Sequence, residues 1–152
     1  MANAIQWSAL GSYTTIIAGA DVAPTLKNLA SAGKKLGNEI DNTGGNLYAD
    51  FDLLCRFAAA ASAGGYVALY FIQAVDGTNY ADGGDAVVPP ATSMAGMFPV
   101  RAVDTAQRVA LAHILLPATK FKPLILNSGG QAFTNTSDEN VLSYRTYTEE
   151  IQ

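Results

Sequence analysis

The residues that could do acid–base or metal chemistry begin with one histidine and one cysteine. His113 lies in the apolar run ALAHILL, and Cys55 lies on the apolar side of an alternating run. A catalytic histidine needs an orienting carboxylate and usually a nucleophile, and neither these nor a G-x-S-x-G motif can be identified. One histidine and one cysteine do not form a zinc site without several carboxylates. We therefore expect a structural histidine, a buried thiol, no cofactor and no enzymatic activity.

Acidic side chains form two further groups. Asp50 and Asp52 share one strand face and could imitate the carboxylate pair of a glycosidase, but a solvated face paired with Arg56 is favoured. We expect alanine at either position, or at His113, to affect stability and to leave function intact. Four oxygen-bearing side chains lie within ten residues: Asp76, Asn79, Asp82 and Asp85. They could hold calcium, although their spacing is not that of an EF-hand loop and Asx turns explain them equally well. A site without metal is the prediction, and a cation is the open alternative.

Aromatic side chains are numerous for a chain in which only 14% of the residues are charged. They are Trp7, Tyr13, Tyr48, Tyr66, Tyr70, Tyr80, Tyr144 and Tyr147. An exposed row of rings could stack on sugars, and tyrosine is also common in protein interfaces. Burial in a core or an interface is the favoured interpretation.

Two long runs must position these side chains. Residues 47–57, LYADFDLLCRF, alternate between apolar and mostly polar positions, which predicts a strand with one buried face. Residues 66–75, YVALYFIQAV, are apolar on both faces and are flanked by Gly-Gly and Asp-Gly, which favours a strand over a helix. Such a strand is either central and covered or packed against another subunit.

The remaining chain adds short strands separated by turn signals. Further strands are expected at residues 12–18, 97–103, 107–116, 121–127, 131–133 and 141–148. Residues 26–31 and 34–40 predict a hairpin that turns at Ala32 and Gly33. Residues 4–10 are an edge strand or an arm, and residues 76–96 form one long ordered loop. The pattern predicts one all-β domain over residues 1–152, a β-sandwich for which a jelly roll is favoured.

Composition excludes several classes. The net charge of −4, with no block of basic residues, argues against nucleic-acid binding. No run of about 18 apolar residues predicts a membrane span, and the first residues do not have the pattern of a signal peptide. A single cysteine fits synthesis in a reducing cytoplasm.

Four segments resemble a family of tailed-bacteriophage structural proteins. They are VDGTNY (75–80), GMFPVRAV (96–103), LLPATKFKPLILNSGGQAF (115–133) and LSYRTYTEE (142–150). The resemblance covers somewhat more than half of the chain. Residues before 66 depart from the family's pattern, apart from the strand LYADFDL.

The resemblance implies a virion protein, similar to the jelly-roll decoration or cement proteins of phage heads, with no cofactor and no catalytic residue. Expected partners are the major capsid protein or other virion proteins and further copies of the chain, with a homotrimer favoured. The expected assembly contacts are Ile5, Trp7, Asp76, Asn79, Tyr80, Pro89 and Pro90. The alternative is a carbohydrate-binding β-sandwich module associated with a tail or fibre.

Overall fold

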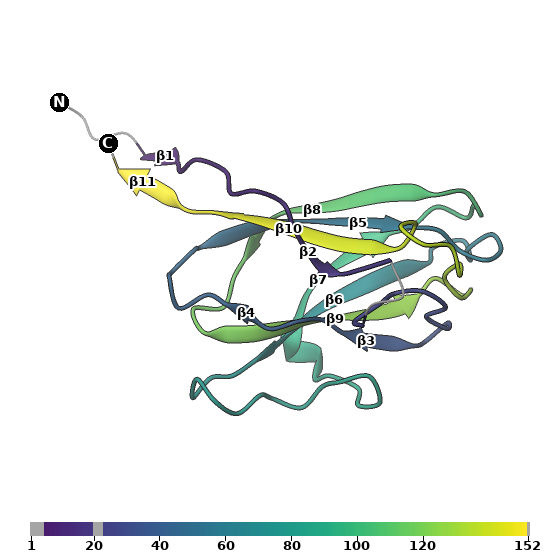
Figure 1. Cartoon of the computed structure of the whole chain (residues 1–152), viewed down its shortest axis with the longest axis horizontal. Helices are drawn as coiled ribbons and strands as arrows, with labels where there is room; N and C mark the ends of the chain where they lie inside the picture. The colour runs from purple at the N-terminus through teal and green to yellow at the C-terminus, as the bar shows by residue number, and fades with distance from the viewer. Residues whose placement is uncertain (1–4, 20–22, 152) are drawn as a thin grey trace.

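Two antiparallel sheets packed face to face form the body of the molecule (Figure 1). The computed structural model describes residues 5–19 and 23–151. One sheet contains, in spatial order, β2 (Thr14–Ile17), β10 (Val141–Tyr147), β5 (Tyr48–Cys55) and β8 (Gln107–Leu115). The other contains β3 (Lys34–Leu36), β9 (Lys120–Ser128), β6 (Tyr66–Gln73) and β7 (Met94–Pro99), with β4 (Ile40–Asp41) also paired to β9.

The strand order is that of a jelly roll. Successive strands cross from one sheet to the other, so that β5 and β6, β7 and β8, and β9 and β10 each contribute one strand to either sheet. All strand pairs within the two sheets are antiparallel. The predicted all-β sandwich is confirmed, and its order is the favoured jelly roll.

The core forms because β5 alternates as its sequence predicts. Ala49, Phe51, Leu53 and Cys55 are completely buried, while the residues between them face outward. Phe51 packs on Phe71 of the opposite sheet, with the ring centroids 5.5 Å apart. Burying a side chain of this size contributes about 2–3 kcal/mol, so this strand anchors the sandwich.

The strand β6 is central in its sheet, and its outer face is covered by the chain itself. Ala68 and Ile72 point outward from the sandwich and are nonetheless buried. The segment after β6 folds back over this face (Figure 1), where the backbone of Gly83 lies against Ile72 and Ala81 donates a hydrogen bond to the Gln73 carbonyl. The outer face of this two-sided apolar strand is therefore covered within one chain at Ala68 and Ile72, whereas Tyr66 at its start stays 38% exposed.

Several predicted boundaries are wrong. Residues 26–31 form turns instead of a strand, so the predicted hairpin does not exist, and β3 pairs with β9. The turn lies close to its expected place, with Ala32 in the left-handed region at φ 61°. The strand β7 begins at Met94 and ends at Pro99, a residue that cannot donate to a ladder. Residues 131–133 contribute only a bridge between Phe57 and Phe133.

A two-stranded ribbon projects from one end of the sandwich (Figure 1). It consists of β1 (Ile5–Trp7) and β11 (Glu149–Ile151), and Ile5 pairs with Ile151. The sequence predicted an arm or an edge strand here, and the ribbon is an arm that is itself paired. The helical element η1 (Ala91–Ser93) is one turn of 3-10 helix. None of the helices in the described ranges is long and apolar enough to cross a membrane.

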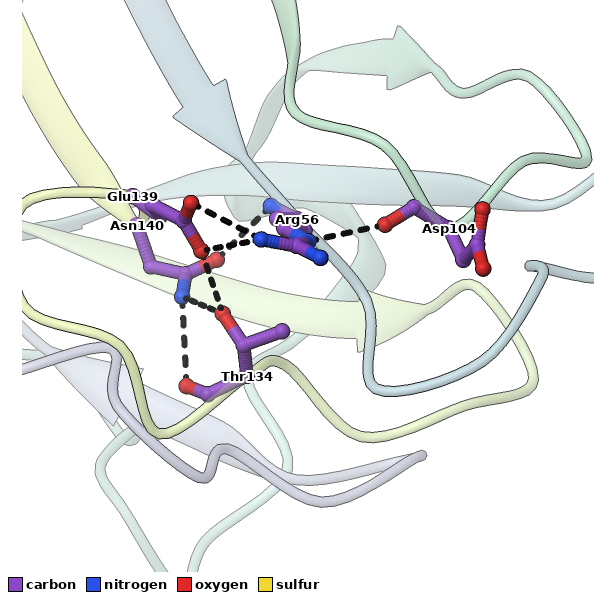
Figure 2. Close-up of polar contacts among 5 residues, drawn as sticks. All are labelled: Arg56, Asp104, Thr134, Glu139 and Asn140. Carbon is purple, nitrogen blue, oxygen red and sulfur yellow. Dashed lines mark hydrogen bonds and ion pairs between the residues drawn. The ribbon is translucent and has the colours of Figure 1, made fainter.

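A polar network joins three connections at the end of β5 (Figure 2). The Arg56 guanidinium donates to both carboxylate oxygens of Glu139, at 3.0 and 3.2 Å, and to the carbonyl of Asp104 at 2.9 Å. The buried Asn140 accepts the Arg56 backbone N–H at 2.9 Å and donates to the carbonyl and hydroxyl of Thr134. The network therefore ties together the loop after β5, the loop before β8 and the loop before β10.

Replacing Arg56 with alanine should lower the free energy of unfolding by about 1–2 kcal/mol. The change removes the hydrogen bonds to Glu139 and Asp104, and partial exposure of Arg56 keeps the loss moderate. Urea denaturation would measure it. Arg108→Ala is the matched control, because that exposed arginine has one ion pair, with Asp52, and should contribute less than about 0.5 kcal/mol. Equal effects of the two changes would contradict the role of the network.

Candidate functional site

The outer face of the sheet β2–β10–β5–β8 gathers the polar and aromatic side chains that the two strands β5 and β10 turn away from the core. In the ladder between them, Tyr147 pairs with Tyr48, Arg145 with Asp50, and Ser143 with Asp52. Paired residues point to the same face. A pair of tyrosine rings, an arginine–aspartate pair and a serine–aspartate pair therefore follow one another along the two strands.

Asp50 is the most highly connected side chain of this face. Its Oδ2 accepts from Nε and Nη2 of Arg145 at 3.1 and 2.9 Å. Its Oδ1 accepts from the Tyr147 hydroxyl at 3.2 Å and from the His113 backbone N–H at 3.1 Å. Burial by itself would raise the pKa of Asp50, but these donors outweigh it and leave the pKa below the ordinary value. Asp50 is therefore a stable carboxylate that orders its neighbours.

His113 occupies a bulge in β8. The register between β5 and β8 shifts between Ala49 and Phe51, and His113 has a left-handed backbone with φ 58°. A residue other than glycine is uncommon in this region, and its N–H is satisfied by Asp50. The bulge turns the imidazole toward Tyr48, on which it stacks with a centroid distance of 4.0 Å.

The β1 strand brings Trp7 onto the same rings. Trp7 meets Tyr48, His113 and Tyr147 edge to face, with centroids 6.0, 5.1 and 5.5 Å apart. The Tyr147 hydroxyl also lies 3.3 Å from Nδ1 of His113. These four rings hold the base of the ribbon against the sheet, while Trp7 stays 56% exposed. An open hollow of about 340 Å³ lies beside them, lined by Trp7, Leu10, Asp50 and Tyr147.

A second hollow, of about 370 Å³, lies farther along the same face. It is lined by Tyr13, Asp52, Leu54, Arg108, Val141 and Ser143. The guanidinium carbon of Arg145 lies 5.0 Å from the centroid of the Tyr13 ring, and Arg108 Nη1 is 3.0 Å from Asp52 Oδ2. The expected pairing of the two aspartates with Arg56 is wrong, because Arg145 and Arg108 take that role.

The polar side chains of this face are held by partners of their own. Ser143 Oγ lies 3.4 Å from Oγ1 of Thr15, and burial heads the causes that raise the pKa of Tyr147. Asp50 accepts the His113 backbone N–H, and the Tyr147 hydroxyl lies 3.2 Å from Asp50 Oδ1 and 3.3 Å from His113 Nδ1. Rings, guanidinium groups and carboxylates in fixed positions can recognise a ligand.

Cys55 and the acidic loop behave as local structure. Cys55 is buried, as predicted, and burial raises its pKa to about 12. Asp76 accepts from the backbone N–H groups of Thr78 and Asn79 and from Asn79 Nδ2, and these bonds lower its pKa to about 2. Asp85 pairs with Lys35 at 2.6 Å and accepts the Leu36 N–H. Asp76 thus has the Asx-turn role, and within the described ranges no group of three possible metal ligands occurs.

The expected assembly contacts lie at two separate places. Ile5 and Trp7 lie on the ribbon, and the other five lie in the loop after β6: Asp76, Asn79, Tyr80, Pro89 and Pro90. Tyr80 donates to the Glu39 carboxylate, and the Lys122 ammonium lies 4.2 Å from the Tyr80 ring centroid. Pro89 is buried and Pro90 is exposed. The loop therefore has extensive contacts within its own chain, whereas Ile5 is 70% exposed.

Sequence reasoning did not anticipate that Tyr13, Arg108 and Arg145 would join Asp50 and Trp7 on one face. The alternation of Arg145 and Tyr147 in the last long strand was a usable signal for the side to which they point. The local sequence did not show that β10 pairs with β5, because the two strands are far apart in the chain.

Comparison with known proteins gives little. No protein-family model matches the chain, and no curated protein matches it in sequence. A solved structure of the carbohydrate-binding module CBM36 in complex with calcium and xylotriose is similar over 100% of both chains, with 13% identity and a TM-score of 0.42. A likeness of this degree carries no argument about function, and the fold assignment rests on the strand order itself.

Proposed function

We propose that the chain is a non-enzymatic virion structural protein of a tailed phage, a capsid decoration or cement protein that binds the head shell and copies of itself. The resemblance of the segments between residues 75 and 150 to phage structural proteins supports this proposal. The observation that carries it is the ribbon, which extends an exposed apolar residue, Ile5, away from a closed sandwich. Three exposed apolar side chains lie within six residues of this arm, namely Ile5, Trp7 and Leu10, and grouped exposed apolar side chains mark interaction sites.

The ribbon would act as a clamp on a neighbouring subunit. Burying one aliphatic side chain contributes about 1.5–3 kcal/mol, which is weak for one contact. On a symmetric shell many copies bind together, so modest contacts add through avidity. Binding only the assembled shell would stabilise it by mass action. A homotrimer, to be measured by light scattering, remains the favoured oligomer.

The test is co-sedimentation with particles that lack the protein. Ile5→Ser should weaken binding at least about tenfold, because 1.4 kcal/mol corresponds to a factor of ten. Leu115→Ser is the matched control, since Leu115 is also a strand residue and is 67% exposed, but lies on β8. Loss of binding in both variants, or in neither, would contradict the role of the ribbon.

Deleting residues 1–10 gives the complementary result. The deletion removes β1, which pairs only with β11 among the described strands, so the jelly roll should still unfold cooperatively on heating. We expect it to bind particles poorly. Normal binding would remove the arm from the mechanism, and a truncated chain without a thermal transition would make the ribbon part of the folding unit.

The second candidate function is a carbohydrate-binding module associated with a tail or fibre. The row of rings and charge pairs on the outer sheet face favours it. Cryo-microscopy of intact particles distinguishes the two candidates, since density for this chain on the head would favour decoration and density on the tail would favour the module.

A further inference from the structure

We propose that the outer face of the sheet β2–β10–β5–β8 binds an uncharged glycan chain across two subsites, one at Trp7 and one at Tyr13. The proposal goes beyond the decoration role and gives the second candidate function a defined site. It does not require a particular position in a particle, because it rests only on the two hollows and the side chains that line them.

Each hollow presents one largely exposed ring. Trp7 is 56% exposed and Tyr13 is 55% exposed, although both are held by neighbours. The edge-to-face contacts with Tyr147 and His113 fix Trp7, and the Arg145 guanidinium fixes Tyr13. A ring face is flat and apolar, as is the C–H face of a pyranose, so stacking removes apolar surface of both from water. Fixed rings lose little conformational freedom on binding.

Polar groups in the hollow beside Tyr13 can recognise hydroxyl groups. Arg108 uses one nitrogen for Asp52, and its side chain is 67% exposed, so further N–H groups of the guanidinium are accessible to a ligand. Ser143 lines the same hollow and can donate or accept. Asp50 already accepts from three residues and serves to hold Arg145 and Tyr147 in place.

The charges of the face favour a neutral ligand. Asp50 pairs with Arg145 and Asp52 with Arg108, so the positive and negative groups compensate each other locally. The chain as a whole carries a net charge of −4, which would repel a polyanion. The hollows, of about 340 and 370 Å³, are each within the usual size range of small-molecule sites.

The test is native affinity electrophoresis of the full chain in gels that contain dextran, galactomannan or mixed-linkage β-glucan, with alginate as an acidic polymer. We expect at least one neutral polymer to slow the wild-type protein. Tyr13→Ala and Trp7→Ala should each weaken the apparent affinity at least fivefold, and Arg108→Ala should weaken it as well. Tyr66→Ala is the control, since Tyr66 is a partly exposed tyrosine on the other sheet.

The proposal would be overturned if alginate alone slowed the protein or if none of the neutral polymers did. It would also be overturned if a neutral polymer slowed the wild type and Tyr13→Ala equally. Thermal melting of each variant shows whether it is folded, and Arg108→Ala supplies the test if a ring variant is not. The particle assay separates this proposal from decoration. Tyr13→Ala should still co-sediment with particles, and Ile5→Ser should still be retarded in the gel.

Discussion

Replacing Asn127 with alanine is expected to lower the free energy of unfolding by about 3–4 kcal/mol. The Asn127 side chain is completely buried. Its Nδ2 donates to the carbonyls of Leu29, Ala30 and Gln131 at 3.0, 3.2 and 2.8 Å, and its Oδ1 accepts the Gly129 N–H at 3.0 Å. Alanine would remove the partner of the Gly129 N–H and of the Gln131 carbonyl, whereas the Leu29 and Ala30 carbonyls would keep the N–H groups of Phe133 and Gly33. A buried unsatisfied group costs about 1–3 kcal/mol.

Urea denaturation followed by far-ultraviolet circular dichroism would measure the loss. Asn135→Ala is the control, because Asn135 is exposed and accepts one bond, from Asn28. We expect a change within about 0.5 kcal/mol for the control. An effect of Asn127→Ala as small as that of the control would mean that water replaces the amide without loss.

Asp50→Ala should cost about 2–3 kcal/mol at neutral pH. The change removes the acceptor of Arg145 and Tyr147 and of the His113 N–H in its bulge. Asp52→Ala is the matched control on the same face, two residues away, since Asp52 has one ion pair with an exposed arginine. We expect the control to change stability by less than about 1 kcal/mol.

The effect of Asp50→Ala should depend on pH in a defined direction. The folded-state pKa of Asp50 lies below its ordinary value of 3.8, so the carboxylate contributes stability above that value. This contribution is lost as the pH falls through the folded-state pKa. The difference in unfolding free energy between wild type and variant should be constant from pH 7 to 5 and shrink at pH 3. A difference that grows on acidification would contradict this account.

The sequence predicted the strands best where alternation was strict. The strand β5 and the inward set of β10 follow period 2, and burial of one face leaves no choice of register. The prediction of a strand at residues 26–31 was wrong because isolated apolar residues and a nearby glycine do not distinguish a strand from consecutive turns. There the buried Asn127 amide, a residue nearly 100 positions later, fixes the backbone at Leu29 and Ala30.

Some residues of the candidate site were predictable individually, but their arrangement was not. Each of Trp7, Asp50 and His113 was recognised as a residue that could do chemistry or make a contact, and each was given a structural or interface role. These residues lie together because of the bulge in β8 and because β1 pairs with β11. The second pairing joins segments from opposite ends of the chain. Local pattern does not contain that information.

The pairing of β1 with β11 also determines the order in which the molecule can be completed. Both β1 and β2 pair only with β10 and β11 among the described strands, at sequence separations above 120 residues. Closing so long a loop has a large entropic penalty, and such contacts form slowly. During translation β1 and β2 therefore have no strand to join until β10 and β11 leave the ribosome.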